Sequence, residues 1–249
     1  MERGEVFVSG VRISYLKWKE FPIVYIHGSA CDATIWKDQV EEIGGYALDL
    51  PNHGMSDKVE VSRIDDYAYF VAKFVEKKLK KAVLVGHSLG GAVIQKVYEN
   101  YKEVVKALIL IGTGARLRVL PDFLIGLKER PRETVKIFLK YAFSNEKIAE
   151  KFLDIFVERS FILLKDLILC DSFDLLDKYR SGEFRIEVPT LIIVGSEDKL
   201  TPVKYSQFFK NNIPSSKLVV IENASHMVMI EKPKEVNDAI KEFLRINFV

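Results

Sequence analysis

Short apolar runs rich in β-branched residues alternate with helical stretches along the chain. Six of these runs predict buried strands, at residues 23–26, 46–48, 82–85, 107–111, 190–194 and 218–221. Nearly continuous apolar character is typical of strands in a sheet that helices cover on both faces. The alternation of strand and helix therefore predicts an α/β protein with a parallel, doubly wound sheet.

The N-terminal residues follow a different pattern, which predicts an antiparallel hairpin. Residues 5–8 and 11–16 read as two strands on either side of the turn pair Ser9-Gly10,. We place this hairpin at one edge of the sheet, which brings the strand total to eight. Residues 66–80 repeat apolar side chains at helical spacing and predict an amphipathic helix against the core.

The strand rhythm stops between residues 115 and 188, a segment too long for an ordinary loop. Several helical patterns follow one another there, including Ile148, Phe152, Ile155 and Phe156 on one face, and an apolar helix at 161–169. We interpret residues 115–188 as a helical cap, or lid, inserted into a core formed by residues 1–114 and 189–249. Its position predicts that it covers the carboxyl ends of the strands, where open α/β sheets bind ligands.

Charge and composition narrow the class of partner. The 37 basic and 35 acidic residues give a formal net charge of +2, too small to attract nucleic acid or an anionic membrane,. The first residues lack a signal-peptide profile, and no apolar run approaches the ~18 residues of a membrane span. We expect a cytoplasmic protein that binds a small, largely uncharged molecule; the pattern fixes no oligomeric state. Cys31 and Cys170 are expected to be free thiols, with a bridge between them as the alternative.

A Gly-x-Ser-x-Gly pentapeptide, Gly86-His-Ser88-Leu-Gly90, connects the buried strand at 82–85 to a helix. A serine at so tight a turn has a strained backbone and a hydroxyl lifted clear of the sheet, and its neighbours two residues away must be small. The spacing of a Rossmann fingerprint and the ending of a phosphate-binding P-loop are both missing. This context predicts that Ser88 is a catalytic nucleophile.

A serine hydroxyl needs an adjacent base, which in such folds follows an acid late in the chain. Asp198 lies in a polar loop just after the strand at 190–194, and His226 follows the strand at 218–221. We assign Asp198 as the acid and His226 as the base, and Glu197 remains the alternative acid. Of the other histidines, His87 and His53 are expected to be structural.

The histidine at position 27 follows the strand at 23–26 and forms, with Gly28-Ser29, a turn in which a backbone amide can face the site. The four histidines and two cysteines show no metal-ligand spacing such as His-Glu-x-x-His,. The sequence therefore predicts no metal and no other cofactor.

Six segments together resemble the α/β-hydrolase superfamily, in the branch of single-domain bacterial and archaeal esterases, lipases and related hydrolases with a helical cap. They are His27-Gly28, Trp36, 49–56, 86–91, 195–198 and Ser225-His226. The resemblance implies an eight-stranded, mostly parallel sheet with helices on both faces and a helical lid. It also implies that the backbone amides of Ser29 and Leu89 form the oxyanion hole.

The resemblance and the triad together predict a carboxylesterase-type serine hydrolase that cleaves esters of short to medium acyl chain through an acyl-enzyme intermediate. Carbon–carbon bond hydrolysis, perhydrolysis and aminopeptidase-type amide hydrolysis use the same triad and stay open. The loop 27–32 lacks the glycine run of the hormone-sensitive lipases and of the carbon–carbon hydrolases, which disfavours both. A dehalogenase or an epoxide hydrolase is disfavoured, because each would need an aspartate where Ser88 stands. A non-catalytic ligand-binding protein of the same fold is the alternative from another class.

Overall fold

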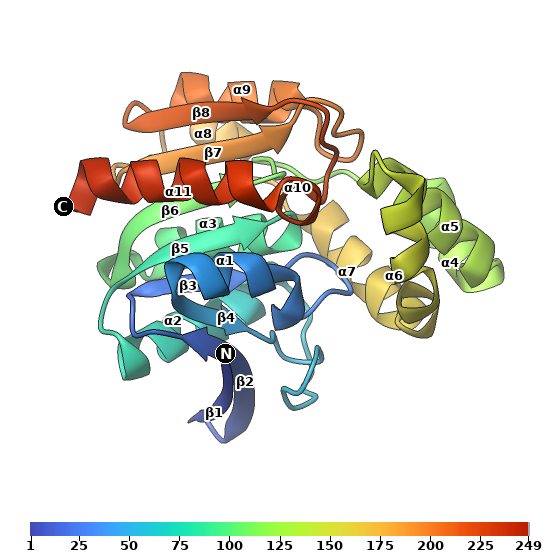
Figure 1. The fold of residues 1–249 in the computed structure, drawn as a ribbon, viewed down its shortest axis with the longest axis horizontal. Coiled ribbons are helices and arrows are strands. Elements are labelled where there is room, and N and C mark those ends of the chain that lie inside the picture. Colours follow the sequence, from blue (N-terminus) through green and yellow to red (C-terminus); the bar gives the residue numbers. More distant parts are fainter. Residues whose placement is uncertain (249) are drawn as a thin grey trace.

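A single eight-stranded sheet forms the centre of the protein in a computed structural model that describes residues 1–248 (Figure 1). Its strands are β1 (Glu2–Val8), β2 (Val11–Trp18), β3 (Ile23–Ile26), β4 (Gly45–Leu48), β5 (Ala82–His87), β6 (Val105–Ile111), β7 (Thr190–Gly195) and β8 (Ser216–Ile221). They lie in the order β1-β2-β4-β3-β5-β6-β7-β8. The hairpin β1–β2 and the pair β2–β4 are antiparallel, and every other pair is parallel. The predicted strands, and the hairpin at the edge, are thus confirmed.

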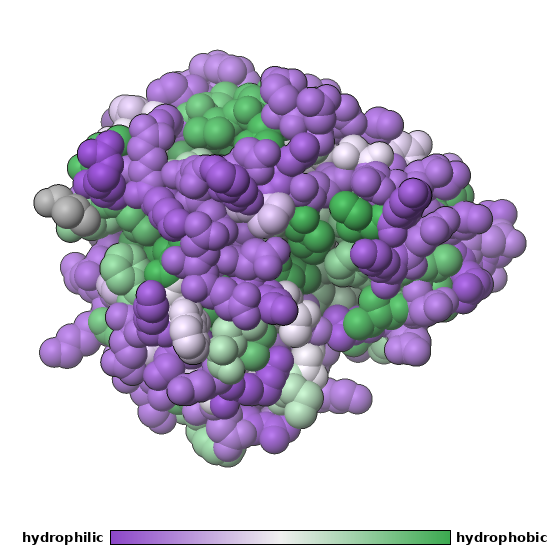
Figure 2. Space-filling model, viewed as in Figure 1, coloured by the Kyte–Doolittle hydropathy of each residue, from purple (hydrophilic) through white to green (hydrophobic). Residues whose placement is uncertain are grey.

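Helices cover both faces of this sheet, as the apolar strands require. The helices outside the insertion are α1 (Lys37–Ile43), α2 (Ile64–Lys78), α3 (Leu89–Asn100), α9 (Val203–Asn212), α10 (Val228–Glu231) and α11 (Pro233–Phe248), with short 3₁₀ turns at Ala33–Trp36 and Lys102–Val104. Apolar side chains of α2, α3 and α9 pack on one face, and those of α1 and α11 pack on the other. The outer surface over α1 and α11, on the side that Figure 2 shows, is mostly hydrophilic.

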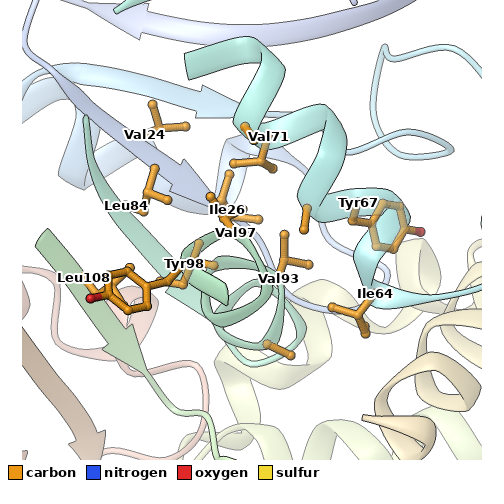
Figure 3. Close-up of a cluster of buried hydrophobic side chains, with 14 of the residues drawn as sticks. Val24, Ile26, Ile64, Tyr67, Val71, Leu84, Val93, Val97, Tyr98 and Leu108 are labelled. Atoms are coloured by element: carbon orange, nitrogen blue, oxygen red, sulfur yellow. The ribbon is translucent and has the colours of Figure 1, made fainter. Parts of the chain in front are cut away.

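The largest part of the core lies between the sheet and helices α2 and α3. Figure 3 shows Val71 of α2 and Val93 of α3 pointing toward strand residues such as Leu84, all of them buried. The predicted helix at 66–80 begins two residues earlier, because the Asp66 carboxylate accepts the Ser62 and Arg63 N–H groups. Such side-chain capping satisfies amides that a helix end would leave unpaired.

The strand predicted at residues 218–221 was expected to be buried, and this was wrong for most of its length. Only Ile221 of β8 is buried, and Val220 is exposed. The physical reason is that β8 is the last strand in the sheet order, so neighbouring elements cover it incompletely. An apolar run alone does not distinguish an edge strand from a central one.

Five helices follow β6 and precede β7: α4 (Pro121–Glu129), α5 (Pro131–Ala142), α6 (Glu146–Glu158), α7 (Ser160–Ser172) and α8 (Leu176–Ser181). Helices α4 to α7 share an apolar cluster that also includes Ala30, Cys31 and Met227. We call these four the cap helices, after the cap predicted for residues 115–188. Helix α8 instead inserts Tyr179 into the main core. Arg116 and Asp174 pair as an isolated β-bridge, so the chain enters and leaves the cap helices at one place.

None of the helices in residues 1–248 combines the length and the apolar character that crossing a membrane would require.

Candidate active site

The loop that carries Ser88 is the tight strand-to-helix turn that the pentapeptide predicts. Strand β5 ends at His87, helix α3 begins at Leu89, and Ser88 between them has φ 52° and ψ −115°. A non-glycine residue in such a conformation costs on the order of 1–3 kcal/mol and persists only where its surroundings impose it. Here the Ser88 N–H donates to the Ile111 carbonyl at 3.0 Å, and the Thr113 hydroxyl donates to the Ser88 carbonyl at 2.9 Å.

The two glycines of the pentapeptide are required by close backbone contacts. A Cβ atom on Gly86 would lie 2.3 Å from the Gly90 carbonyl oxygen, and one on Gly90 would lie 2.3 Å from the Ile26 carbonyl oxygen. Neither neighbour is a flexible side chain that could move aside. The close approach of β3, β5 and α3 thus depends on glycine at both positions, as expected from the sequence.

A buried hydrogen bond joins the two predicted partners of Ser88. His226 Nδ1 donates to Asp198 Oδ2 at 2.9 Å, and the two side chains are 5% and 0% exposed. Because the proton on Nδ1 points at the carboxylate, the other ring nitrogen, Nε2, carries the lone pair that a general base needs. His226 and Ser88 both line one cavity, which brings the predicted base and the predicted nucleophile to the same site.

Asp198 is held in place by three further donors. The Leu200 and Thr201 N–H groups donate to Oδ1 at 2.9 and 2.8 Å, and the Thr201 hydroxyl donates to Oδ2 at 2.8 Å. The alternative acid, Glu197, is exposed, and the carboxylate that His226 Nδ1 contacts is that of Asp198. Thr201 was missed by the sequence reasoning, although an aspartate whose side chain caps the following turn is a recognisable pattern.

The two backbone amides assigned to the oxyanion hole lie next to Ser88. Within residues 1–248 no acceptor takes the N–H of Ser29 or of Leu89, so both remain available to a ligand. The peptide that carries the Ser29 N–H is fixed from behind, because His27 Nδ1 donates to the Gly28 carbonyl at 2.8 Å. His27 Nε2 accepts the Leu50 N–H at 3.1 Å. Since Nε2 therefore carries no proton, the His27 ring is neutral. Burial lowers the pKa of His27 to about 4, in agreement with this tautomer.

The remaining two histidines contact protein groups, in agreement with the structural roles expected for them. His87 Nε2 donates to the His226 backbone carbonyl at 3.0 Å and so supports the loop of the base. Burial, followed by the electrostatic repulsion that two protonated rings, His87 and His226, would exert on each other, lowers the pKa of His87. His53 forms a hydrogen bond from Nδ1 to the Pro51 carbonyl at 2.9 Å. Unexpectedly, its Nε2 also forms a hydrogen bond, at 2.9 Å, to the Asp166 carboxylate of α7.

A cavity of about 170 Å³ lies between the triad and the cap helices. Apolar side chains of the insertion at 115–188 form a large part of its lining: Leu117, Val119, Leu120, Phe123, Phe138, Leu139, Ala142, Phe143, Phe156 and Leu167. Figure 2 shows apolar surface gathered where the cap helices meet the rest of the molecule. Of the four residues singled out on the predicted lid helix, only Phe156 lines the cavity, and Ile155 is exposed.

The segment after the base is also only partly at the site. Met227 lines the cavity, whereas Val228 and Met229 are buried in the core beneath α10.

Cys31 and Cys170 are free and line the cavity. Burial raises the pKa of the Cys170 thiol to about 12, so it stays protonated. Among residues 1–248, no three His, Cys, Asp or Glu side chains gather into a group able to hold a metal ion.

A sequence model of the alpha/beta hydrolase family matches residues 23–239, a range that includes every residue of the site described above. The chain belongs to the α/β-hydrolase family. A solved α/β-hydrolase structure, described as that of a thermophilic esterase, shares 53% sequence identity. It superposes with a TM-score of 0.97 over 99% of this chain and 98% of its own.

Curated α/β-hydrolase relatives are more distant. The pimeloyl-[acyl-carrier protein] methyl ester esterase of Wigglesworthia glossinidia brevipalpis is 27% identical over 90% of this chain and 93% of its own length. The protein ABHD8 of Mus musculus is 29% identical over 94% of this chain, which spans only 57% of that protein's length. The printed names of several of these relatives describe esterases, which supports a hydrolase within the α/β-hydrolase family.

Proposed function

We propose that the protein is a serine carboxylesterase that hydrolyses esters of short to medium acyl chain through an acyl-enzyme intermediate. The observation that carries the proposal is that Ser88 and His226 line the same cavity, while Asp198 accepts a hydrogen bond from Nδ1 of the His226 imidazole. The 53% identity to a thermophilic esterase supports the same reaction class.

In the proposed first step, His226 Nε2 takes the hydroxyl proton of Ser88 while Ser88 Oγ attacks the ester carbonyl. The carbonyl oxygen becomes an oxyanion, which accepts the Ser29 and Leu89 N–H groups. Two such pre-aimed donors stabilise the charge that develops there, and losing one typically costs about 2.7–4 kcal/mol. The imidazolium, stabilised by Asp198, then protonates the leaving alkoxide, and the ester bond breaks.

The second half of the reaction repeats the first with water. Neutral His226 takes a proton from a water molecule, which attacks the acyl-Ser88 carbonyl and forms a second oxyanion. Collapse of this intermediate returns the proton to Ser88 Oγ and releases the carboxylic acid. This scheme uses no cofactor. We propose that the insertion at 115–188 covers the bound substrate as a cap. We also expect the protein to be located in the cytoplasm.

The cavity's size and lining support the proposed substrate class. An engineered apolar cavity of about 150 Å³ binds benzene, so the cavity of about 170 Å³ would take a group of roughly six carbons. Each methylene that enters it contributes up to about 0.8 kcal/mol, or about a fourfold gain in kcat/KM. Longer acyl chains would have to leave part of their length outside.

The test is kcat/KM for p-nitrophenyl esters from acetate to palmitate. We expect a maximum between butyrate and octanoate. Phe138, which is buried and lines the cavity, offers the matched variant: Phe138→Ala should move the maximum to a longer chain. Phe161→Ala is the control, because Phe161 of α7 is exposed and does not line the cavity.

Two outcomes would contradict the proposal. A maximum at palmitate with activation at an oil–water interface would make the protein a lipase, and the seven large apolar side chains that the insertion exposes would then be the surface to examine: Leu120, Ile125, Ile137, Tyr141, Ile155, Phe161 and Ile168. Negligible turnover of every ester would favour a carbon–carbon hydrolase or a ligand-binding protein.

A further inference from the structure

A buried carboxylate in the cap helices has no part in the proposed chemistry. Asp166 interrupts the apolar face of α7 and is only 1% exposed. Burying a charge is costly unless partners compensate it, and all partners of Asp166 come from outside the cap helices. Its Oδ2 accepts the Ala30 N–H at 2.8 Å and His53 Nε2–H at 2.9 Å, and its Oδ1 accepts the Tyr67 hydroxyl at 3.3 Å.

The Ala30 N–H belongs to the peptide that follows Ser29, one of the two proposed oxyanion donors. Ala30 has φ 56°, a left-handed conformation that is uncommon for a residue with a side chain,. A second cap residue holds its other side: Arg159 donates from Nη1 to the Ala30 carbonyl at 3.1 Å and from Nη2 to Asp32 at 2.7 Å. Side chains at the start and middle of α7 therefore clamp the loop 27–32 at both peptide groups of Ala30.

His53 reinforces the carboxylate. Both of its ring nitrogens contact acceptors, the Pro51 carbonyl at 2.9 Å and Asp166 at 2.9 Å, so both must carry a proton for both bonds to form,. The ring is then an imidazolium paired with the carboxylate. Charge-assisted bonds of this kind are about twice as strong as neutral ones, which makes Asp166 a rigid anchor rather than a mobile side chain.

We propose that Asp166 is a positioning residue that aims the Ser29 N–H of the oxyanion hole from the cap helices, an inference that rests on the proposed function. His27 fixes the Gly28 carbonyl on one side of Ser29, and Asp166 fixes the Ala30 N–H on the other. Because the peptide groups on both sides of the Ser29 Cα atom are held by hydrogen bonds, the Ser29 N–H keeps a single orientation. Docking of α7 and assembly of the oxyanion hole are then a single event.

The test compares Asp166→Asn and Asp166→Ala with Asp154→Asn. Asp154 is the matched control, because it is an exposed cap carboxylate whose ion pair with Arg132, at 3.1 Å, is remote from the loop 27–32. The assay measures kcat and KM on the best p-nitrophenyl ester. The concentration of active sites comes from fluorophosphonate titration run to completion, so that unfolded molecules are not counted.

A positioning role predicts a loss in kcat with KM changed less than about threefold. We expect kcat per active site to fall by about 10-fold in Asp166→Asn, which keeps one acceptor oxygen, and by up to about 10²–10³-fold in Asp166→Ala, the range for losing an oxyanion donor. Asp154→Asn should match the wild type. Wild-type kcat per active site in both Asp166 variants, with only a lower fraction of active sites, would overturn the proposal.

Two further measurements keep the test decisive. If Asp166→Ala does not fold, Arg159→Gln loosens the same loop from a partly exposed position and should lower kcat in the same way; unchanged kcat there would contradict the clamp. Hydrogen exchange of residues 27–32, followed by mass spectrometry, does not depend on turnover. Faster exchange in Asp166→Asn than in Asp154→Asn supports the anchor even if the wild type cleaves no ester, and equal exchange overturns it.

Discussion

Replacing Asp198 with Asn tests the electrostatic arrangement of the site without changing its shape. The side chain is fully buried, and Oδ1 would still accept the Leu200 and Thr201 N–H groups. In place of Oδ2, however, the amide presents an N–H to His226 Nδ1. The imidazole must then accept at Nδ1 and carry its proton on Nε2, where it can no longer take the proton of Ser88.

The wrong tautomer is expected to lower kcat by about 10⁴-fold, which corresponds to about 5 kcal/mol of transition-state stabilisation. Folding should suffer much less, by about 1–3 kcal/mol, because one charged hydrogen bond is lost in an otherwise intact turn. The control is Glu197→Gln, which removes the charge of the adjacent exposed carboxylate. That variant should keep kcat within about twofold of the wild type.

The assay is steady-state hydrolysis of a p-nitrophenyl ester, with thermal unfolding measured on the same samples. Small and equal losses in the Asp198→Asn and Glu197→Gln variants would refute the reasoning, since the acid would then lie at neither position. A large loss confined to Glu197→Gln would move the acid to that residue and contradict the 2.9 Å pair with His226.

Three more predictions follow from individual contacts. Gly90→Ala should destabilise the fold by on the order of 3 kcal/mol in denaturant titration, because its Cβ would meet the Ile26 carbonyl oxygen at 2.3 Å,; wild-type stability would contradict this. Thr201→Val removes a hydroxyl donor to a buried carboxylate and should lower kcat by on the order of 10-fold,; an unchanged kcat would make the hydroxyl dispensable. Burial opposes the charged form of His53, but the Asp166 carboxylate outweighs it and raises the His53 pKa. The stability from this pair is full at acid pH and lost as pH rises through that pKa, so unfolding free energy should decline with pH there more in the wild type than in His53→Gln; parallel profiles would exclude the charged pair.

Local signals in the sequence were sufficient to predict the sheet, and to select three residues, Ser88, Asp198 and His226, that the fold brings to one site. Strand β5 is buried along its whole length, and the glycines around Ser88 are needed for a backbone contact that the pentapeptide implies. Asp198 and His226 each follow a strand, and parallel strands bring their carboxyl ends to one edge of the sheet. Choosing Asp198 over Glu197 agrees with the contact to His226, although adjacent carboxylates are chemically alike.

The cap could not be predicted at the same level, because helical periodicity defines a face but not its neighbour. Phe156 turns toward the cavity while Ile155, one residue earlier, is exposed, since the cap helices also pack on one another. Asp166 was overlooked, although a single carboxylate within the apolar run at 161–169 was a usable signal. Its partners, Ala30 and His53, lie more than 100 residues away in the chain, and only the fold brings them together.

The most direct test of the central claim is to identify the residue that a fluorophosphonate modifies. We predict a single adduct, on Ser88, which appears in step with the loss of esterase activity, and no adduct in a folded Ser88→Ala variant whose kcat is lower by on the order of 10³-fold or more. An adduct on any other residue, or a Ser88→Ala variant that still turns over esters at the wild-type rate, would contradict the assignment of Ser88 as the nucleophile.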